Sequence, residues 1–390
     1  MGMYKENIEK LKNIKLKSWY IILIIITIND TSTNIVHREI NQYLILILCI
    51  IFVVINVIKK ILKPTFDKNK ILLCISLLLI LIYGVILSVF NGGIQLYSIN
   101  DIIFILISIL FFLFSIDLYD KNINLNHYFI LTISLILMSG SISINNGLTL
   151  DLVMEEGKYR DYSQGLSFVF SIFLISMYNH YLNEKKIIYL FSILICFLLV
   201  IYGAARGEFL ALTLTIIIMS IKRNFIKTII LICVLIFVIS VIIIKFELEN
   251  ELLLINRLSQ INQNNLGLRD ILWLDGYNLI INDVSPIGNG LSYFQKYYNY
   301  ESSKYPHNLF IEIIITYGIF GFILSFLMLV GCVNIYKNQN TLNLIVLFAF
   351  LVLLKSGSIF NFFSFWVISM LLYNSFNLIK NINVKKYFKL

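Results

Sequence analysis

Residues 309–335 read LFIEIIITYGIFGFILSFLMLVGCVNI. A helix that crosses a bilayer needs about 20 apolar residues, so this stretch is long enough to span a membrane with residues to spare. Two glycines, Gly318 and Gly321, interrupt it, and long helices commonly bend or break at such positions. We therefore predict a membrane-spanning segment that is divided into two helices at these glycines.

The composition of this stretch extends along the whole chain. Of the 390 residues, 59% are hydrophobic and 14% are charged, and the mean hydropathy is +0.85. Soluble domains are about 45–50% apolar and about 25% charged, so the composition excludes a soluble enzyme, a secreted domain and a disordered chain. We expect an all-α polytopic membrane protein that forms one integral domain over residues 1–390.

The apolar runs predict twelve membrane-spanning helices, with two long segments between them near 145–165 and 247–306. The predicted spans lie near 18–29, 40–58, 71–90, 102–119, 128–143, 165–182, 187–202, 208–221, 228–246, 309–335, 342–357 and 359–378.

The basic residues orient these spans. If the N-terminus is cytoplasmic, the inside segments hold 21 of the 31 Lys and Arg residues, which agrees with the preference of cytoplasmic loops for positive charge. Both termini are then cytoplasmic, and both long segments are extracytoplasmic. The lysines before the first span also fit a signal peptide, but no small-residue cleavage site follows them, so we interpret that span as retained.

Neither the net charge of +9 nor the five cysteines indicates a further site. Lysine-rich cytoplasmic loops account for the charge without a nucleic-acid partner. The cysteines all fall in apolar runs and form no CxxC pair, so they predict neither a disulfide framework nor a metal centre.

The arginines are distributed differently from the lysines. Only Arg223 is on the cytoplasmic side, and the five extracytoplasmic arginines are Arg38, Arg160, Arg206, Arg257 and Arg269. A planar guanidinium binds phosphate through two parallel hydrogen bonds and stays charged at any working pH. The set therefore predicts an anionic, phosphate-bearing ligand at the outer face, whereas pairing with acidic side chains or lipid headgroups is the alternative.

Arg206 is the most informative of the five. It lies in the sequence YGAARGE at 202–208, between two predicted spans with almost no loop to carry it into water. An ionisable side chain at that depth is a functional candidate by default, while an ion pair with Glu208 is the structural alternative.

The large extracytoplasmic segment contains an amphipathic pattern, a turn and a histidine. Residues 266–281, LGLRDILWLDGYNLII, predict a helix at the outer interface, followed by a turn at 285–290, SPIGNG. Six tyrosine and phenylalanine residues between 293 and 305 fit either a sugar-binding platform or a membrane-interface belt. His307 follows a proline, and its ordinary pKa near 6.5 suits proton transfer.

Taken in order, these elements resemble the O-antigen ligase and O-antigen/capsule polymerase (Wzy-type) superfamily. The resemblance covers about 200–325. It rests on Ala205-Arg206-Gly207, Arg269 with Trp273, the PIGNG turn at 286–290, His307-Asn308 and the YGIFG element at 317–321.

The resemblance implies a metal-independent membrane glycosyltransferase without a cofactor, built as a GT-C-like bundle in the bacterial inner membrane. Its donor would be an undecaprenyl-diphosphate-linked oligosaccharide, and membrane lipids would surround it. A chain-length regulator and a flippase are its candidate partners. The implied catalytic residues are His307, Arg206 and Arg269, and the implied substrate-binding residues are Arg160, Arg257, Trp273, Asn308 and Tyr293.

Three functions remain open at this point. A polymerase would extend lipid-linked glycan, and we favour it because polymerases are numerous and divergent. A ligase would use the same residues to move finished glycan onto a lipid A core or a protein. A flippase would instead move the lipid-linked glycan without forming a bond, but such proteins carry ionisable groups well inside their spans, which this sequence mostly lacks.

Overall fold

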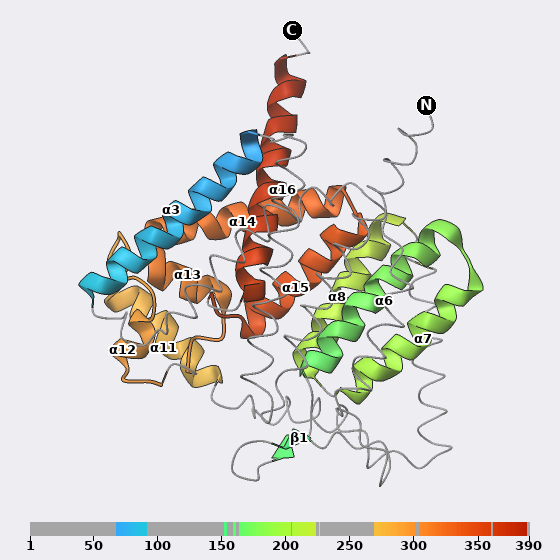
Figure 1. The fold of residues 1–390 in the computed structure, drawn as a ribbon, viewed down its shortest axis with the longest axis horizontal. Coiled ribbons are helices and arrows are strands. Elements are labelled where there is room, and N and C mark those ends of the chain that lie inside the picture. The colour runs from blue at the N-terminus through green and yellow to red at the C-terminus, as the bar shows by residue number, and fades with distance from the viewer. Residues whose placement is uncertain are drawn as a thin grey trace, which may run out of the picture. The chain divides into compact units, whose positions relative to one another are not determined.

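The computed structural model describes the ranges 68–91, 152–153, 159–160, 164–203, 205–223, 226, 269–301, 304–359 and 362–387. Within them the chain is helical (Figure 1) apart from a two-residue antiparallel pair, β1 (Leu152–Val153) and β2 (Tyr159–Arg160). The all-α prediction is confirmed for these ranges. The predicted spans near 18–29, 40–58, 102–119, 128–143 and 228–246 lie outside the described residues, as do Arg38 and Arg257.

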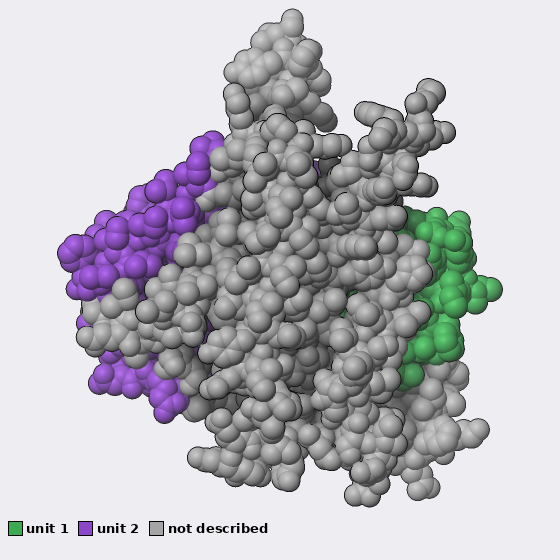
Figure 2. All heavy atoms as spheres, viewed as in Figure 1, with its two compact units in different colours: residues 1–55, 120–263 green, residues 56–119, 264–390 purple. Residues whose placement is uncertain are grey.

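The chain divides into two compact units (Figure 2). In unit 1, Met1–Ile55 with Asp120–Gln263, the described helices are α6 (Gln164–Glu184), α7 (Ile187–Tyr202) and α8 (Arg206–Arg223). In unit 2, Asn56–Tyr119 with Asn264–Leu390, they are α3 (Lys68–Phe90), α11 (Arg269–Asn282), α12 (Tyr293–Tyr297), α13 (Leu309–Tyr317), α14 (Ile319–Lys337), α15 (Thr341–Ser356) and α16 (Phe362–Tyr387).

The described helices follow the predicted spans. The predicted break in 309–335 is confirmed, because α13 ends at Tyr317 and α14 begins at Ile319 with Gly318 between them. Among the described residues, α14 is the one helix that is both long and apolar enough to cross a membrane by itself. Four shorter apolar helical stretches accompany it: Ile75–Phe90, Ile187–Ile201, Thr341–Lys355 and Ser364–Ile379.

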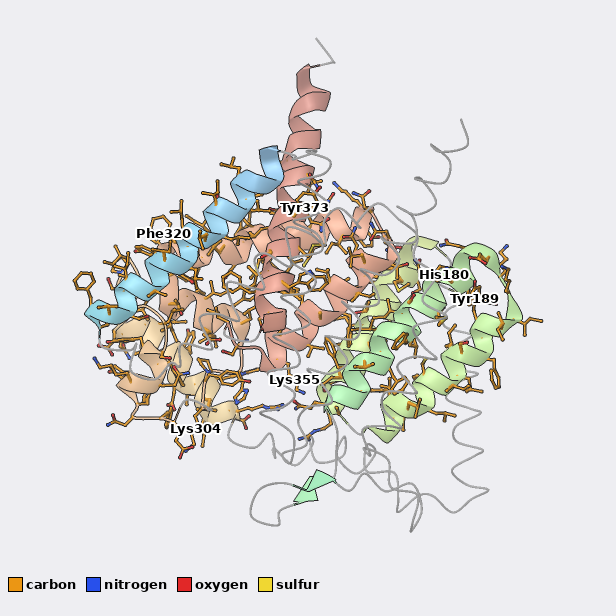
Figure 3. The ribbon with its side chains drawn as sticks, viewed as in Figure 1. His180, Tyr189, Lys304, Phe320, Lys355 and Tyr373 are labelled. Atoms are coloured by element: carbon orange, nitrogen blue, oxygen red, sulfur yellow. The ribbon has the colours of Figure 1, made fainter. Side chains whose placement is uncertain are left out.

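Helix α6 is the central helix of the described part of unit 1, since it packs against both α7 and α8. Its turn into α7 is fixed by Glu184, which pairs with Lys186 at 2.7 Å and accepts a 3.0 Å hydrogen bond from the Tyr189 hydroxyl. His180 is buried and stacks on the Tyr189 ring (Figure 3). These contacts support a structural role for this histidine.

In unit 2, α14, α15 and α16 are joined by a buried asparagine network. Asn374 donates to Asn343 at 3.2 Å and accepts from Asn334 at 2.9 Å, so one side chain links all three helices. Close packing accompanies the network, because a Cβ at Gly331 of α14 would lie 2.2 Å from the backbone oxygen of Leu371 in α16.

Replacing Asn374 should loosen this three-helix contact. We expect Asn374→Ala to lower the free energy of unfolding by about 1–2 kcal/mol, because it removes hydrogen bonds from two buried amides. Thermal unfolding of the protein in detergent measures the change. Asn338→Ala is the matched control: Asn338 is exposed and donates to Asn334 at the edge of the network, so an equal loss in both variants would contradict a central role for Asn374.

Candidate functional site

The break between α13 and α14 is capped by the predicted turn at 285–290. The first backbone N–H of α14, on Ile319, donates to the Pro286 carbonyl at 2.9 Å. Gly318 has φ +56, and a Cβ there would lie 2.3 Å from the Pro286 oxygen. Glycine is therefore required at the break, because the helix end and the turn meet backbone to backbone.

The same turn pairs with the last turn of α13. The N–H groups of Asn289 and Gly290 donate to the carbonyls of Ile315 and Thr316, both at 3.0 Å. Gly288 adopts φ +89, and a Cβ there would lie 2.4 Å from the Thr316 oxygen. The turn thus occupies the carbonyl groups that α13 leaves unpaired at its C-terminal end.

On its other side the turn docks on the end of α3. The Tyr83 hydroxyl donates to the Ile287 carbonyl at 2.6 Å, and the Asn91 amide donates to the Asn289 carbonyl at 2.7 Å. A Cβ at Gly290 (φ +84) would lie 2.4 Å from the backbone nitrogen of Ser88. The glycines of the PIGNG and YGIFG elements therefore serve one junction, in which three backbone segments fix the position of α13.

Helix α11 lies against α13 through one face and leaves another exposed. Its buried residues are Leu272, Gly276 and Leu279, and a Cβ at Gly276 would meet the Ile311 side chain of α13 at 2.6 Å. The predicted helix is confirmed, and its position at the outer interface stays a prediction. Apolar side chains that are 54–61% exposed form the other face: Ile271, Leu274, Tyr277 and Ile281.

His307 lies two residues before α13 in a strained conformation. Its φ is +51, which is uncommon for a residue other than glycine and is found more often at functional sites than elsewhere. The Trp273 indole N–H of α11 donates to the His307 carbonyl at 3.3 Å, and the Tyr305 ring centroid lies 4.0 Å from the imidazole centroid. Asn308 follows as the N-cap of α13 and accepts from the N–H groups of Phe310 and Ile311.

The imidazole of His307 is half-buried and has an unused nitrogen. Its Nδ1 is shielded from solvent and has no hydrogen-bond partner among the described residues. Burial and the nearby charges of Arg269 and Lys355 lower the pKa of His307 to about 4. Burial also raises the pKa of the neighbouring Tyr305 hydroxyl to about 12. At neutral pH the site therefore holds a neutral imidazole, able to accept a proton, next to a permanent cation.

Aromatic residues around α12 mainly hold the loop to α11. The hydroxyls of Tyr298 and Tyr300 donate to the backbone and carboxylate oxygens of Asp275, at 3.0 and 2.7 Å, and their rings stack at 5.5 Å. Tyr293 packs against the buried cluster of Leu272, Leu279, Phe294 and Ile315. These contacts give the tyrosines a structural role, and the sugar platform stays a prediction.

Residues 190–326 match a family model described as O-antigen ligase. The chain contains an O-antigen ligase family domain. Proteins of this family are integral inner-membrane glycosyltransferases or ligases that use lipid-linked glycans in polysaccharide synthesis. No curated protein and no solved structure gives a significant match to the chain.

The O-antigen ligase family domain contains all three predicted catalytic residues. The structure brings Arg269 near His307 within unit 2. Arg206 is the first residue of α8 in unit 1, two residues before the buried Glu208, and its approach to His307 stays a prediction. Of the predicted substrate-binding arginines, Arg160 has its backbone in β2 and Arg257 lies outside the described residues.

Two charged residues at this site were not singled out from the sequence. Glu312 in α13 is 6% exposed, and Lys355 is in the last turn of α15. Each is a charge within an apolar run, which is a recognised sign of function in membrane segments. That signal was present, but the spacing between them gave no reason to connect either residue to His307.

Trp273 is positioned to orient His307 within the O-antigen ligase family domain. We expect Trp273→Phe to lower kcat about fivefold, because it removes one hydrogen bond of about 1 kcal/mol to the His307 carbonyl while keeping an aromatic ring. Glycosyl transfer from a lipid-linked donor by purified protein in vesicles measures the change. Tyr277→Phe, on the exposed face of α11, is the control. Unchanged activity in Trp273→Phe would instead favour a stacking role that any aromatic ring can fill.

Proposed function

We propose that this chain is a polysaccharide polymerase of the O-antigen or capsule type. It would transfer undecaprenyl-diphosphate-linked glycan onto the next lipid-linked repeat unit at the extracytoplasmic face of a bacterial inner membrane. It would act as a multi-pass GT-C-like bundle of about twelve helices, with both termini in the cytoplasm. The observation that carries this proposal is the strained His307, whose shielded Nδ1 has no hydrogen-bond partner among the described residues and on which the charge of Arg269 acts.

The proposed reaction is a single displacement at the anomeric carbon of the donor. His307 removes the proton from the acceptor sugar hydroxyl, and that oxygen forms the new glycosidic bond with inversion. The bond between the anomeric carbon and the diphosphate oxygen breaks. Undecaprenyl diphosphate leaves with the electron pair of that bond, and its developing charge must be neutralised.

The proposed clamp for this leaving group is built from arginines. Arg269 and Arg206 bind the diphosphate, with Arg160 and Arg257 as further contacts, and fixed guanidinium groups supply the neutralisation without a metal. Trp273, Asn308 and Tyr293 are the proposed contacts to the sugars. In the structure Asn308 already uses its side-chain oxygen to cap α13, so its amide N–H is the group left for substrate.

Arg206 tests the clamp directly. We expect Arg206→Ala to abolish chain lengthening while the protein stays in the membrane at its normal level. Arg206→Lys should also fail, because lysine keeps the charge but loses the two-point geometry. Gel analysis of polymer made by membrane vesicles supplied with lipid-linked repeat units measures both. Full activity of Arg206→Ala would remove this residue from the clamp.

A ligase is the second candidate, and it is favoured by the description of the matching family model. The two functions share the donor and differ in the acceptor. Purified protein supplied only with lipid-linked repeat units should give a ladder of lengths if it is a polymerase. Transfer of preassembled glycan in one step to a lipid A core or protein acceptor would identify a ligase. Movement of the lipid-linked glycan across vesicles without bond formation would identify a transporter.

A further inference from the structure

The C-terminal end of α15 lies beside the N-terminal turn of α13. The rings of Phe310 and Phe350 meet edge to face at 5.7 Å. Beyond the end of α15, the Ser358 hydroxyl and the Ile359 N–H donate to the two carboxylate oxygens of Glu312, at 3.0 and 2.8 Å. This junction places the last turn of α15 next to the segment that carries His307.

The hydrogen bonds from Ser358 and Ile359 to Glu312 are a specific contact of the fold. A carboxylate that is 6% exposed is costly to bury unless its oxygens are hydrogen-bonded. Here each oxygen has a donor from the same short segment. The segment after α15 is therefore held to the first turn of α13, and the side chains in the last turn of α15 are held with it.

Lys355 is the charged residue in that last turn. It is half-buried and ends an apolar helical stretch, Thr341–Lys355. A lysine in such a stretch is costly to insert and usually serves an ion or a substrate. A lysine at a helix C-terminus can also simply complement the helix dipole, but that role does not account for the effect of its charge on the half-buried His307 imidazole.

Two cations from different helices thus act on His307, Arg269 of α11 and Lys355 of α15. Lys304, much closer in the sequence, is instead directed at the Tyr300 ring, with its nitrogen 5.8 Å from the ring centroid. The convergence of Arg269 and Lys355 is therefore a property of the fold rather than of local sequence.

We propose that Lys355 binds the diphosphate of the lipid-linked donor, so that Arg269 and Lys355 together hold the anion next to the His307 imidazole. This inference rests on the function proposed above.

The arrangement makes the strength of the base depend on the donor. The charges of Arg269 from α11 and Lys355 from α15 act on the imidazole, the Tyr305 ring lies against it, and Glu312 of α13 acts in turn on Tyr305. Without an anion, burial and the charges of Arg269 and Lys355 disfavour a proton on His307, and its pKa is lowered to about 4. A bound diphosphate offsets both positive charges. The pKa of His307 then rises toward its ordinary value, and the imidazole becomes a stronger base when the donor is in place.

Inorganic pyrophosphate is the probe for this site. The full-length protein in phosphatidylcholine nanodiscs, with histidine labelled at the ring carbons, gives an NMR titration of each imidazole, and His307→Gln identifies the signal of interest. We expect pyrophosphate to raise the pKa of His307 in the wild type. In Lys355→Gln the starting pKa should be higher, the pyrophosphate-induced rise smaller, and the Kd for pyrophosphate weaker by about tenfold, as expected for the loss of one ionic hydrogen bond.

Two further variants separate binding from folding. Lys355→Arg keeps the charge and should retain most of the pyrophosphate affinity. If Lys355 were merely structural, Lys355→Gln would bind pyrophosphate with the same Kd as the wild type. Lys304→Gln is the matched control and should behave as the wild type. If Lys355→Gln leaves both the pyrophosphate Kd and the His307 response unchanged, the proposal is wrong.

Lipid headgroups offer the same phosphate chemistry, so the nanodisc composition is varied. A Lys355-dependent rise in the pKa of His307 caused by phosphatidylglycerol, with no response to pyrophosphate, would overturn the proposal. The test of this anion site and the test of the proposed function can fail independently of each other. If the pyrophosphate response is present but no lipid-linked repeat unit is polymerised, the anion site stands and the polymerase proposal fails. If polymer forms but Lys355→Gln responds as the wild type, only this inference fails.

Discussion

His307→Asn is expected to reduce polymer formation by about 10²–10⁴-fold, which is the usual contribution of a positioned proton acceptor. Asparagine tolerates the positive φ of this position better than most residues, so the variant removes the imidazole without adding backbone strain. The initial rate of chain lengthening by purified protein in vesicles measures the effect.

His180→Asn is the matched control for this variant. His180 is a buried histidine that stacks on Tyr189 in unit 1, so its loss should affect stability more than rate. Comparable loss of the rate per folded molecule in both variants would argue that His307 supports the structure only. Retention of more than about a tenth of the activity in His307→Asn would exclude it as the main base.

The pH dependence follows from the same site. Because the pKa of His307 is lowered to about 4, its imidazole stays neutral in the free protein throughout the range above that value. We therefore expect the contribution of His307 to kcat/KM, which reports on the free enzyme, to be lost only as the pH falls through about 4. A loss centred near 6.5 that disappears in His307→Asn would show that Arg269, Lys355 and burial do not act on this group as described.

Gly288→Ala is expected to have the largest effect on folding. The position has φ +89, and an added Cβ would lie 2.4 Å from the Thr316 carbonyl oxygen. A left-handed alanine alone costs about 1–2 kcal/mol, and here the clash is with backbone that cannot rotate away. We expect a loss of at least about 3 kcal/mol, which is a large part of the stability of a typical domain.

Size-exclusion profiles and thermal unfolding in detergent measure that loss, and Gly276→Ala is the matched control. Gly276 lies within α11, and its added Cβ would meet the Ile311 side chain at 2.6 Å, so local side-chain movement can absorb part of the contact. We expect a smaller drop in Tm for this variant. If Gly288→Ala unfolds at the wild-type Tm, the junction between the turn and α13 does not need glycine there.

Much of the helical framework could be predicted from the sequence. The seven predicted spans that fall on described residues are helical, and the break at Gly318 is where the apolar run 309–335 indicated it. Hydropathy and backbone preferences are properties of a single segment, so they can be assessed without knowing its neighbours. A bilayer strengthens them, because a spanning segment must be apolar and must pair its own backbone groups. The motif order likewise pointed to the O-antigen ligase family domain that the family model matches at 190–326.

The roles of particular residues could not be predicted in the same way. The resemblance implied Trp273 as a contact for substrate, which stays a prediction, and the structure adds that its indole N–H donates to the His307 carbonyl. The glycines of the PIGNG turn looked like markers of a loop, but they allow three backbone segments to meet. Both contacts join segments that are distant in the chain, so they cannot be predicted from the spacing of residues in the sequence.

The sequence by itself therefore determined where the described helices of the predicted spans lie and which family domain the range 190–326 resembles, because composition and local periodicity are enough to specify segments that must bury their own backbone. Only the tertiary structure decided which charges surround His307. That environment depends on α11, α13 and α15 meeting at one point, since electrostatic interactions are set by distance in space and not by position in the chain.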